Sequence, residues 1–493
     1  MSDSFEDLSI LREGIHLEAK SAQRGFPKSF WESYAAMANT DGGTILLGIS
    51  EDGQGNLSAT GVYDIDDAQR QLWNNVNNPG KASANVLTTD DVKVLRLDEH
   101  DVLAVRVPRA SRTTRPVFIN GNPLTGTLRR NGEGDYRCSR EEYEAMVRDA
   151  APAGSDGTPL PEHALASLSA ETIAAYRNLL GSTRPDHPWL QLSDDELLVR
   201  LGAASRTPQD GELHPTRAGL LCFGYEYEIV REFPGYFLDF RDQSTPEAAR
   251  WSDRVVSNDG AWSGNVFDFW RMVSPRLGAL LRRPFSLDGR MLRIDDTAMH
   301  RALREGLVNA LVHADYLGRR GTTVIAHGDS VEFANPGTSL VPIPVALSGG
   351  ISDTRNPTML KIFGLVNACE KAGSGLDAIQ AACSAAGAAA PELREAFSPD
   401  RTMLTIHLGS AAGGAISTET QQGRLELAPV SADERRVLET LGAASAPLSR
   451  ADVQRALGCG STKAKRLLSA LVAKGAVETT GSGNRTAYQL PTQ

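Results

Sequence analysis

Closely spaced arginines are the first feature of this sequence that could do chemistry. Between Arg106 and Arg140 there are eight arginines and two acidic residues, in a chain of formal net charge −10. Because salt screens a charge beyond about 10 Å, local composition decides what such a segment binds. Guanidinium groups contact phosphate oxygens readily, so we expect this segment to bind a nucleic-acid backbone. The expected contacts are Arg106, Arg109, Arg112, Arg115, Arg129 and Arg130.

A second basic segment lies at the end of the chain, where residues 430–493 hold nine Lys/Arg and five Asp/Glu. Apolar spacing and capping residues predict helices at 432–443, 450–457 and 462–474, followed by a hairpin with its tip at 481–483. This is the order of elements in a winged helix-turn-helix, whose third helix enters the major groove with its N-terminal residues. A protein contact in place of DNA is the alternative. The expected DNA contacts are Ser461, Thr462, Lys463, Lys465, Arg466 and Arg485.

A carboxylate and an amide share one face of a helix expected over 302–316. Glu305 and Asn309 are four residues apart, a spacing that places both side chains on the same side of a helix. Further along, residues 331–340 read as a strand that enters a turn. After it, a short glycine-rich loop opens another helix, and amide groups at a helix N-terminus form a natural phosphate site. The loop consists of Gly373, Ser374 and Gly375.

Together these segments resemble the GHKL ATPase module of a family of bacterial transcriptional regulators formerly labelled as related to the RecG helicase. The resemblance covers about residues 290–408. It implies that Asn309 ligates Mg²⁺, that Glu305 orients or activates the attacking water, and that the glycine-rich loop binds phosphate. Asn335 and Gly337 stand where the family carries its adenine-contacting Asp-x-Gly. ATP and Mg²⁺ are therefore the expected cofactors. ATP hydrolysis stays open, and a GHKL fold without nucleotide is the alternative. No GxxxxGK(S/T) sequence occurs, which argues against a motor helicase.

A third pattern begins with Glu13, Glu18 and Lys20 and continues as MANTDGGTILLGISEDG. With the later segments PVFINGN and TLRRNGEGDYRCSREE, it resembles the Schlafen AlbA_2 domain over about residues 13–146. The resemblance implies an α+β domain that contacts nucleic acid. Vertebrate relatives carry three acids there that form a metal-dependent RNase site directed at tRNA. By motif, these acids fall on Glu13, Glu18 and Glu51, with Lys20 beside them.

Such an acidic group has the chemistry for phosphate esters. Carboxylates bind hard cations such as Mg²⁺ or Mn²⁺, and a bound metal stabilises charge on a phosphate and activates water. Glu51 stands where the family has an aspartate, and Asp52 is the neighbouring alternative. Nucleic-acid binding without cleavage is therefore the competing interpretation.

Two segments of linker-like composition divide the chain. Residues 151–162 are rich in Pro, Gly and Ala, and residues 409–423 are almost entirely small and polar, as is typical of connections between domains. We therefore expect an α+β multidomain protein. Its expected parts are an AlbA_2/Schlafen-like α+β domain (10–150), an intermediate α+β segment (160–285), a divergent GHKL-type α/β sandwich (286–408), a flexible linker (409–429) and a winged helix-turn-helix (430–493).

The remaining expectations concern location, assembly and role. Five cysteines without zinc-like spacing indicate a reducing compartment, and no apolar run is long enough for a membrane span, so we expect a cytoplasmic protein. The chain has one AlbA_2 copy where vertebrate Schlafens use two lobes, so a homodimer or higher homo-oligomer is expected. The predicted function is that of a DNA-binding transcriptional regulator whose conformation responds to ATP. The alternatives are a Schlafen-type metal-dependent endoribonuclease, directed at tRNA in antiphage defence, and an oligomeric scaffold without catalytic activity.

Overall fold

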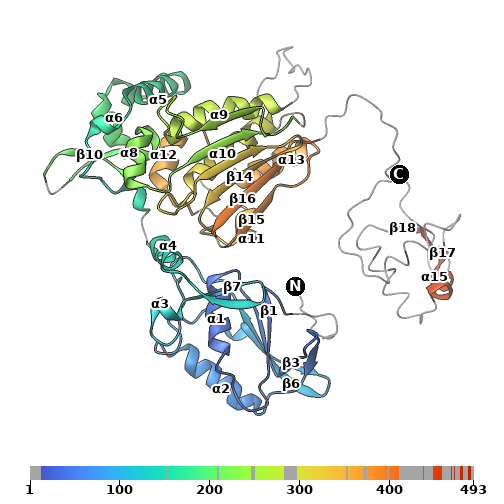
Figure 1. Ribbon diagram of the computed structural model, residues 1–493. Helices are drawn as coiled ribbons and strands as arrows, with labels where there is room; N and C mark the ends of the chain where they lie inside the picture. Colours follow the sequence, from blue (N-terminus) through green and yellow to red (C-terminus); the bar gives the residue numbers. More distant parts are fainter. Residues whose placement is uncertain are drawn as a thin grey trace. The chain divides into compact units, whose positions relative to one another are not determined.

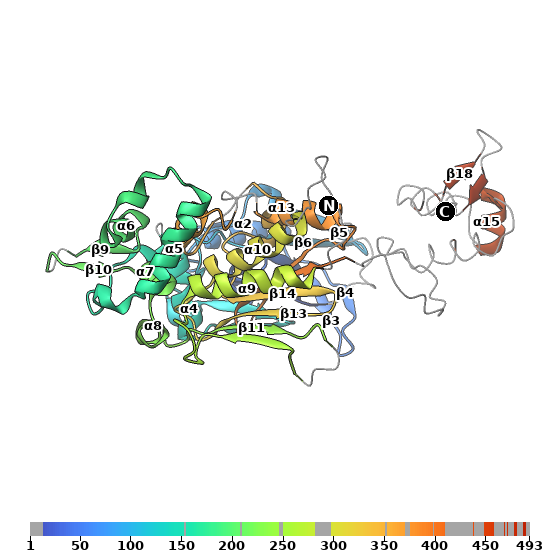
Figure 2. The same cartoon turned by 90° about the horizontal axis from the view of Figure 1, so that it is seen from above.

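The computed structural model describes residues 13–409 except 152–153, 208–209, 246–249, 282–296, 351–352, 370–374 and 398. In the C-terminal part it describes residues 437, 448–457, 468, 471, 478–480 and 487–489. The chain forms two compact units, Met1–Ala411 and Ala412–Gln493, which are described separately (Figures 1 and 2). The secondary structure is mixed α+β, which confirms the predicted fold class at that level.

The first part of the larger unit, called here the N-terminal domain (residues 13–150), is built on a four-stranded sheet. Its strand order is β1 (Leu17–Lys20), β2 (Gly43–Leu47), β6 (His100–Val107) and β5 (Val92–Leu97). Helix α1 (Phe30–Asn39) packs on this sheet and is buried along almost its whole length. The apolar spacing of residues 28–39 predicts this helix, and the apolar run 44–49 predicts the strand that follows it. Both predictions are confirmed by α1 and β2. The turn between them requires a glycine at 42, because its φ is +74° and a Cβ there would lie 2.8 Å from the Val107 carbonyl oxygen.

Smaller elements complete the N-terminal domain around this sheet. Four short strands form two antiparallel pairs. The last helix of the domain begins with a capping box at Ser139. The elements are β3 (Ile49–Glu51), β4 (Leu57–Ala59), α2 (Ile65–Val76), α3 (Pro123–Gly126), β7 (Leu128–Asn131), β8 (Gly134–Arg137) and α4 (Arg140–Ala150).

A six-stranded sheet carries the second part of the larger unit (Figure 1). Its only parallel pair joins two strands far apart in sequence, β11 and β13, whereas the other pairs are antiparallel. The strand order is β12 (Asp253–Val256), β11 (Leu238–Asp242), β13 (Thr322–Ala326), β14 (Ser330–Pro336), β16 (Arg401–His407) and β15 (Glu392–Ala396).

Helices cover this sheet and bury a common apolar core (Figure 2). The central helix α10 (Ala298–Val312) packs between α9 (Val266–Leu280) and α13 (Gly375–Ala385), and it lies directly on β14. The sheet and these helices are called here the sandwich domain. The helix predicted over 302–316 is therefore confirmed. It begins earlier than expected because Thr297 accepts a hydrogen bond from the amide of His300 as N-cap.

Further helices pack against the same core from the segment that follows the N-terminal domain. They are α5 (Ala170–Thr183), α6 (Asp194–Leu201), α7 (Arg217–Phe223) and α8 (Glu226–Glu232), with the short strand pair β9 (Ala204–Arg206) and β10 (Leu213–Pro215). Two more helices follow β14 in the chain: α12 (Pro357–Leu365) also packs against this core, and α11 (Ile343–Leu347) contacts α13 and β15.

The boundary expected near residue 285 does not separate two cores. Strands β11 and β12 come from the supposed intermediate segment, yet they are hydrogen-bonded into the same sheet as the four strands of residues 322–407. The apolar residues on both sides of that boundary also belong to one continuous cluster. The reason is that a parallel strand pair needs a long crossover connection, and this crossover spans the expected boundary.

The smaller unit contains α15 (Arg450–Leu457) and a three-stranded sheet of β17 (Leu448–Ser449), β19 (Ala487–Gln489) and β18 (Glu478–Thr480). The helix predicted at 450–457 and its Ser449 cap are confirmed, since the Ser449 hydroxyl accepts from the amide of Asp452 at 3.3 Å. The third helix and the hairpin tip lie mostly outside the described residues, and so do all six expected DNA contacts, Ser461, Thr462, Lys463, Lys465, Arg466 and Arg485. The winged helix therefore stays a prediction.

Within the described residues, none of the helices combines the length and the apolar character needed to cross a membrane.

Candidate functional site

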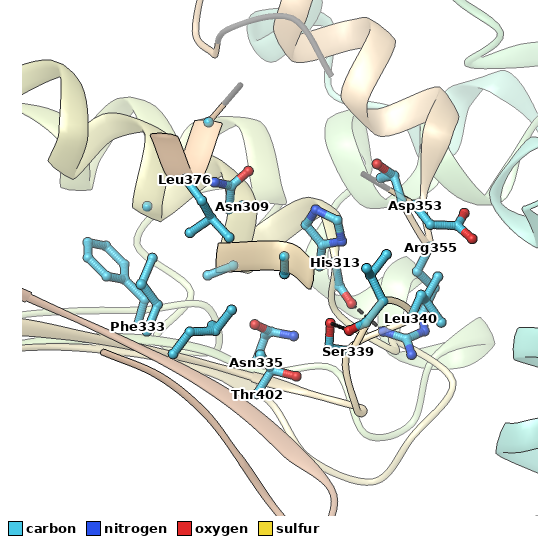
Figure 3. Close-up of a pocket in the computed structure, with 18 of the residues that line it drawn as sticks. Asn309, His313, Phe333, Asn335, Ser339, Leu340, Asp353, Arg355, Leu376 and Thr402 are labelled. Carbon is cyan, nitrogen blue, oxygen red and sulfur yellow. Dashed lines mark hydrogen bonds between the residues drawn. The ribbon is translucent and has the colours of Figure 1, made fainter. Parts of the chain in front are cut away.

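A pocket lies between the central helix α10 and the strands β14 and β16 (Figure 3). Its empty space is about 990 Å³, including the part open to solvent. Five segments of the chain supply its walls, and three of them carry residues predicted for the ATP site. The predicted residues that line it are Glu305, Asn309, Asn335 and Gly375.

Helix α10 presents its polar residues to the pocket because of their spacing. Glu305 and Asn309 lie on one face, while Leu303 and Leu307 on the other side are fully buried in the core. Glu305 is only 6% exposed, so its carboxylate lies at the floor of the pocket and away from bulk water. The helix thus holds a carboxylate and an amide at fixed positions on a rigid element.

Strand β14 ends at the pocket with a buried amide. Asn335 is 5% exposed and pairs in the sheet with Thr402, which also lines the pocket. The turn after it depends on Gly337, whose φ is +91° and whose carbonyl accepts from the Thr402 hydroxyl at 2.9 Å. Gly337 itself shapes the turn and does not line the pocket. The Asn335 amide offers both a donor and an acceptor, which suits the edge of a nucleobase.

Helix α13 begins against the carboxylate of α10. A Cβ on Gly375 would lie 2.2 Å from Glu305 Oε1 and 3.2 Å from Asn309 Nδ2, so a larger residue at this position would displace the Glu305 carboxylate. The N-terminal turn of α13 therefore stands directly over the two polar residues of α10. The other two residues of the predicted phosphate loop, Gly373 and Ser374, lie outside the described residues.

One wall of the pocket carries charged residues that the sequence did not single out. Asp353 and Arg355 line it next to His313, the C-cap residue of α10. Burial lowers the pKa of His313 to about 4, and the neighbouring Arg355 charge adds to this effect. His313 is therefore neutral near pH 7 and presents one donor and one acceptor nitrogen. Figure 3 shows its ring on the same side of the pocket as Asn309.

In the N-terminal domain, the three predicted acids Glu13, Glu18 and Glu51 lie near one another, and neighbouring cations offset part of their charge. Burial raises the pKa of Glu13, and the nearby carboxylates of Glu18 and Glu51 raise it further. Glu18 is bonded to Lys20 at 2.7 Å and to Arg130 at 2.6 Å, so two cations offset its charge. In the described part of the chain, no group of three or more His, Cys, Asp or Glu is arranged to hold a metal ion. Glu18, Lys20 and Arg130 thus form an ion-pair network, and the metal role of Glu13, Glu18 and Glu51 stays a prediction.

Two of the arginines predicted for nucleic acid have structural partners within the N-terminal domain. Arg130 is fully buried and is bonded to Glu18 and Asp135 and to the Gly14 carbonyl. Arg106 is exposed and is bonded to Asp91 at 2.6 Å. Arg130 therefore holds the domain together, whereas Arg106 is reachable from solvent.

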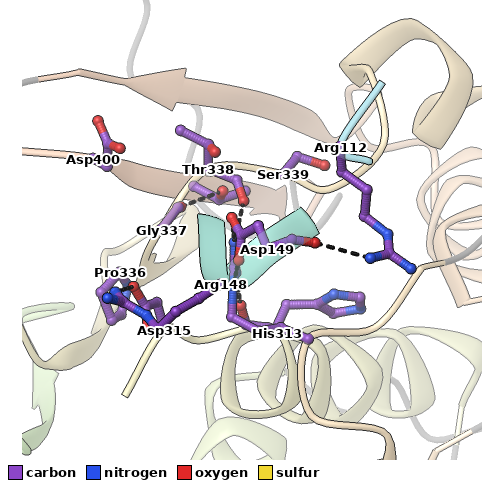
Figure 4. A network of polar contacts seen from close by, with 12 residues as sticks. Arg112, Arg148, Asp149, His313, Asp315, Pro336, Gly337, Thr338, Ser339 and Asp400 are labelled. Carbon is purple, nitrogen blue, oxygen red and sulfur yellow. Dashed lines mark hydrogen bonds and ion pairs between the residues drawn. The ribbon is translucent and has the colours of Figure 1, made fainter. Parts of the chain in front are cut away.

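Three others reach across to the sandwich domain. Arg109 makes a bidentate pair with Glu395 on β15, at 2.5 and 3.0 Å, and Arg129 binds both carboxylate oxygens of Asp400, at 2.6 and 2.7 Å. Arg112 pairs with Asp353 of the pocket wall. Two more pairs run beside them, Arg148 with Asp315 at 2.9 Å and Arg355 with Asp149 at 2.8 Å (Figure 4).

The sixth, Arg115, differs from all of these. It is 4% exposed, and its side chain makes no hydrogen bond or ion pair with any described residue. Burial lowers the pKa of Arg115 to about 9, and the charges of Arg109 and Arg129 lower it further. The contact between the two domains therefore encloses a cation without a carboxylate of its own.

Comparison with known families identifies two of these regions. Residues 13–139 match the family model "Schlafen, AlbA_2". The N-terminal domain is therefore similar to Schlafen AlbA_2 domains and is called the AlbA_2 domain below. Residues 322–406 match the model HATPase_c_4, described as "Putative ATP-dependent DNA helicase recG C-terminal", so the sandwich domain contains a RecG-related HATPase-like segment. Residues 144–239, which follow the AlbA_2 domain, match a domain of unknown function, DUF8451.

Two solved structures are similar to the chain. One is the DIP2311 protein from Corynebacterium diphtheriae, at 17% identity and a TM-score of 0.41, over 97% of this chain and 95% of that chain. The other is the N-terminal domain of a RecG-related protein from Nitrosomonas europaea, at 29% identity and a TM-score of 0.22, over 27% of this chain and 90% of that chain. No curated protein matches.

The HATPase match begins after α10, so the helix that carries Glu305 and Asn309 lies outside it. The structure nevertheless brings this helix to the matched strands, which the sequence could only suggest. The sequence missed His313, Asp353 and Arg355 as pocket residues. A signal existed for Arg355, since it lies within residues 290–408, which resemble the regulator family, but no spacing rule linked it to the AlbA_2 domain.

Proposed function

We propose that this protein is a regulator that binds ATP in the pocket of its HATPase-like domain and nucleic acid through its AlbA_2 domain, with the first event controlling the second. The observation that carries this proposal is a shared wall. Asp353 and Arg355 line the pocket, and the same two side chains pair with Arg112 and Asp149 of the AlbA_2 domain. A ligand in the pocket therefore touches the residues that hold the two domains together.

The lining of the pocket suits a nucleotide. Phe333, Leu340, Leu376 and Leu404 provide apolar surface for a base, and Asn335 provides the polar group that reads its edge. Asn309 supplies an oxygen ligand for Mg²⁺, which neutralises phosphate charge when bound. Glu305 is the group to orient a water for hydrolysis, and its place beside the first turn of α13 keeps it near the phosphate position.

Regulation requires that the nucleotide binds one arrangement of the two domains better than another. Bound ATP can create this difference in affinity, because its triphosphate adds several negative charges beside Asp353 and Arg355 on the pocket wall. We propose that the nucleotide controls DNA binding and thereby transcription, and that C-terminal residues from 461 to 485 make further DNA contacts. Location in the cytoplasm and assembly into a homodimer belong to the same proposal.

The experiment that tests the nucleotide site measures ATP affinity of the full chain by calorimetry with Mg²⁺ present. We expect Asn335→Ala and Asn309→Ala to lower the affinity by about 5- to 100-fold each, because each removes a hydrogen bond or ligand worth about 1–3 kcal/mol. Gln380→Ala removes an amide from the exposed face of α13 and serves as the matched control. Equal affinity of all three variants and the wild-type protein would refute the site.

A further inference from the structure

Four arginines of the AlbA_2 domain face the HATPase-like domain and are called here the arginine surface: Arg109, Arg112, Arg115 and Arg129. The side chains of Arg109 and Glu395 are each 5% exposed, and that of Arg129 is 7% exposed. These pairs are thus formed away from water, where a charge is stable only with a partner. The HATPase-like domain supplies three of their carboxylate partners, on Glu395, Asp353 and Asp400. The AlbA_2 domain supplies two more at longer range, Asp41 at 3.9 Å from Arg109 and Glu142 at 3.5 Å from Arg129.

Arg115 differs from the other three arginines, because its side chain pairs with no carboxylate among the described residues. Its guanidinium lies among the charges of Arg109 and Arg129, and the acids that act on it, Asp149 and Glu395, are each bonded to another arginine. Like charges enclosed together are unfavourable, and a domain contact selected only for stability would not keep a buried cation without a partner. A surface that also binds closely spaced anions explains why this arginine is present.

The carboxylates occupy the surface in the manner of phosphates. Glu395 presents two oxygens to two nitrogens of Arg109, and Asp400 presents two oxygens to Arg129. A phosphodiester presents two free oxygens to guanidinium in the same bidentate way. Successive phosphates along a nucleic-acid strand can therefore take the places of Glu395 and Asp400, and Arg115 would gain the anionic partner that it lacks.

We propose that the arginine surface is the nucleic-acid-binding surface of the AlbA_2 domain, and that Glu395, Asp353 and Asp400 occupy it in place of backbone phosphates until nucleic acid displaces them. This rests on the proposed function, because it presumes that the protein binds nucleic acid. The closed arrangement lowers the apparent affinity, because only the open fraction of molecules is competent to bind.

The test uses the full chain and the double variant E395Q/D400N, which removes two competing charges and keeps the side-chain shapes. Binding to a DNA duplex of about 30 base pairs and to total tRNA is measured by fluorescence anisotropy at one salt concentration, since affinity varies steeply with salt. We expect the variant to bind at least one probe about tenfold or more tightly than wild type. The probe that gains identifies whether DNA or RNA is the natural source of the phosphates.

Two further variants make the result specific. E392Q removes an exposed carboxylate from the same strand, β15, and is expected to leave binding unchanged. Adding R109A and R129A to E395Q/D400N is expected to abolish the gain. A folded E395Q/D400N protein without a gain, or a gain that survives the loss of both arginines, would overturn the inference.

Hydrogen exchange on the wild-type protein covers the case in which the variant does not fold. The Ser339 amide donates to Glu395 at 2.7 Å, so opening of the contact should raise deuterium uptake at residues 338–341 when nucleic acid is added. Unchanged or lower uptake with bound nucleic acid would contradict displacement while leaving nucleic-acid binding intact. Failure of wild type and variant alike to bind either probe would contradict the proposed function itself.

Discussion

The contact between Gly375 and Glu305 shows how much of the nucleotide site depends on single residues. A glycine at the first position of α13 lets the helix approach the carboxylate and the Asn309 amide more closely than any other residue permits. Glu305 and Asn309 lie on α10, and the first turn of α13 packs against both side chains. The geometry of the polar pair is therefore set by a residue that carries no functional group.

This gives a prediction at the residue scale. In Gly375→Ala the new Cβ would lie 2.2 Å from Glu305 Oε1, so the carboxylate must move. We expect ATP affinity to fall by about tenfold or more, the equivalent of roughly 1.4 kcal/mol, with any ATPase activity falling at least as far. Gly364→Ala in α12 is the control, because nothing lies within 4 Å of its Cβ. If Gly375→Ala binds ATP as wild type does, the site does not depend on this contact.

At the scale of elements, the side chain of Asp156 connects the segment after the AlbA_2 domain to helix α12. Asp156 is 2% exposed, and its carboxylate accepts from the amides of Thr358 at 2.8 Å and Met359 at 3.0 Å. These amides belong to the first turn of α12, where backbone donors have no partner within the helix. Asp156 therefore caps a helix that begins 201 residues later in the chain, counted from 156 to 357.

Removing this cap tests the arrangement. Asp156→Ala should lower the free energy of unfolding of the larger unit by about 1–2 kcal/mol, because two amides lose their acceptor at a buried helix end. Denaturant unfolding of Asp156→Ala and of Ser155→Ala, an exposed neighbour, gives the comparison. An equal effect of both substitutions would show that the segment is not fixed by the cap.

Elements set by neighbouring residues were predictable, whereas those set by distant partners were not. The periodicity of residues 28–39 and 302–316 predicted α1 and α10, and the Ser449 cap predicted α15, because these signals lie within a few residues. The Pro, Gly and Ala content of 151–162 indicated a linker but could not show that Asp156 reaches α12. Likewise, no local signal revealed that β11 pairs with β13 across the expected boundary.

The candidate site follows the same division. Helical spacing placed Glu305 and Asn309 on one face, and the resemblance to the GHKL family indicated Asn335. The arginines of 106–130 were correctly recognised as a cluster, but their burial against carboxylates depends on how two domains meet. Composition gives the number of charges and not their partners, so it could not distinguish Arg130, which holds the domain core, from Arg109, which faces Glu395.

At the scale of the whole molecule, the shared wall predicts reciprocal coupling. If ATP changes the affinity for nucleic acid by some factor, nucleic acid must change the affinity for ATP by the same factor. We expect Arg112→Ala to bring this factor close to one, because it cuts the pair with Asp353 on the pocket wall. ATP titrations with and without a saturating DNA duplex measure it in both proteins. Arg70→Ala, which removes an exposed arginine of α2, is the control, and an unchanged factor in Arg112→Ala would refute the route.

The single parallel strand pair of the six-stranded sheet limits how the gene can recombine. Strand β11 comes before the matched HATPase segment and lies in the sheet beside β13, the first strand of that segment. A recombination event that transferred residues 322–406 alone would leave β13 as an open edge, and open edges invite aggregation. Genes that carry the HATPase-like segment of this type should therefore also carry the preceding strands, so that the two segments are inherited as one block.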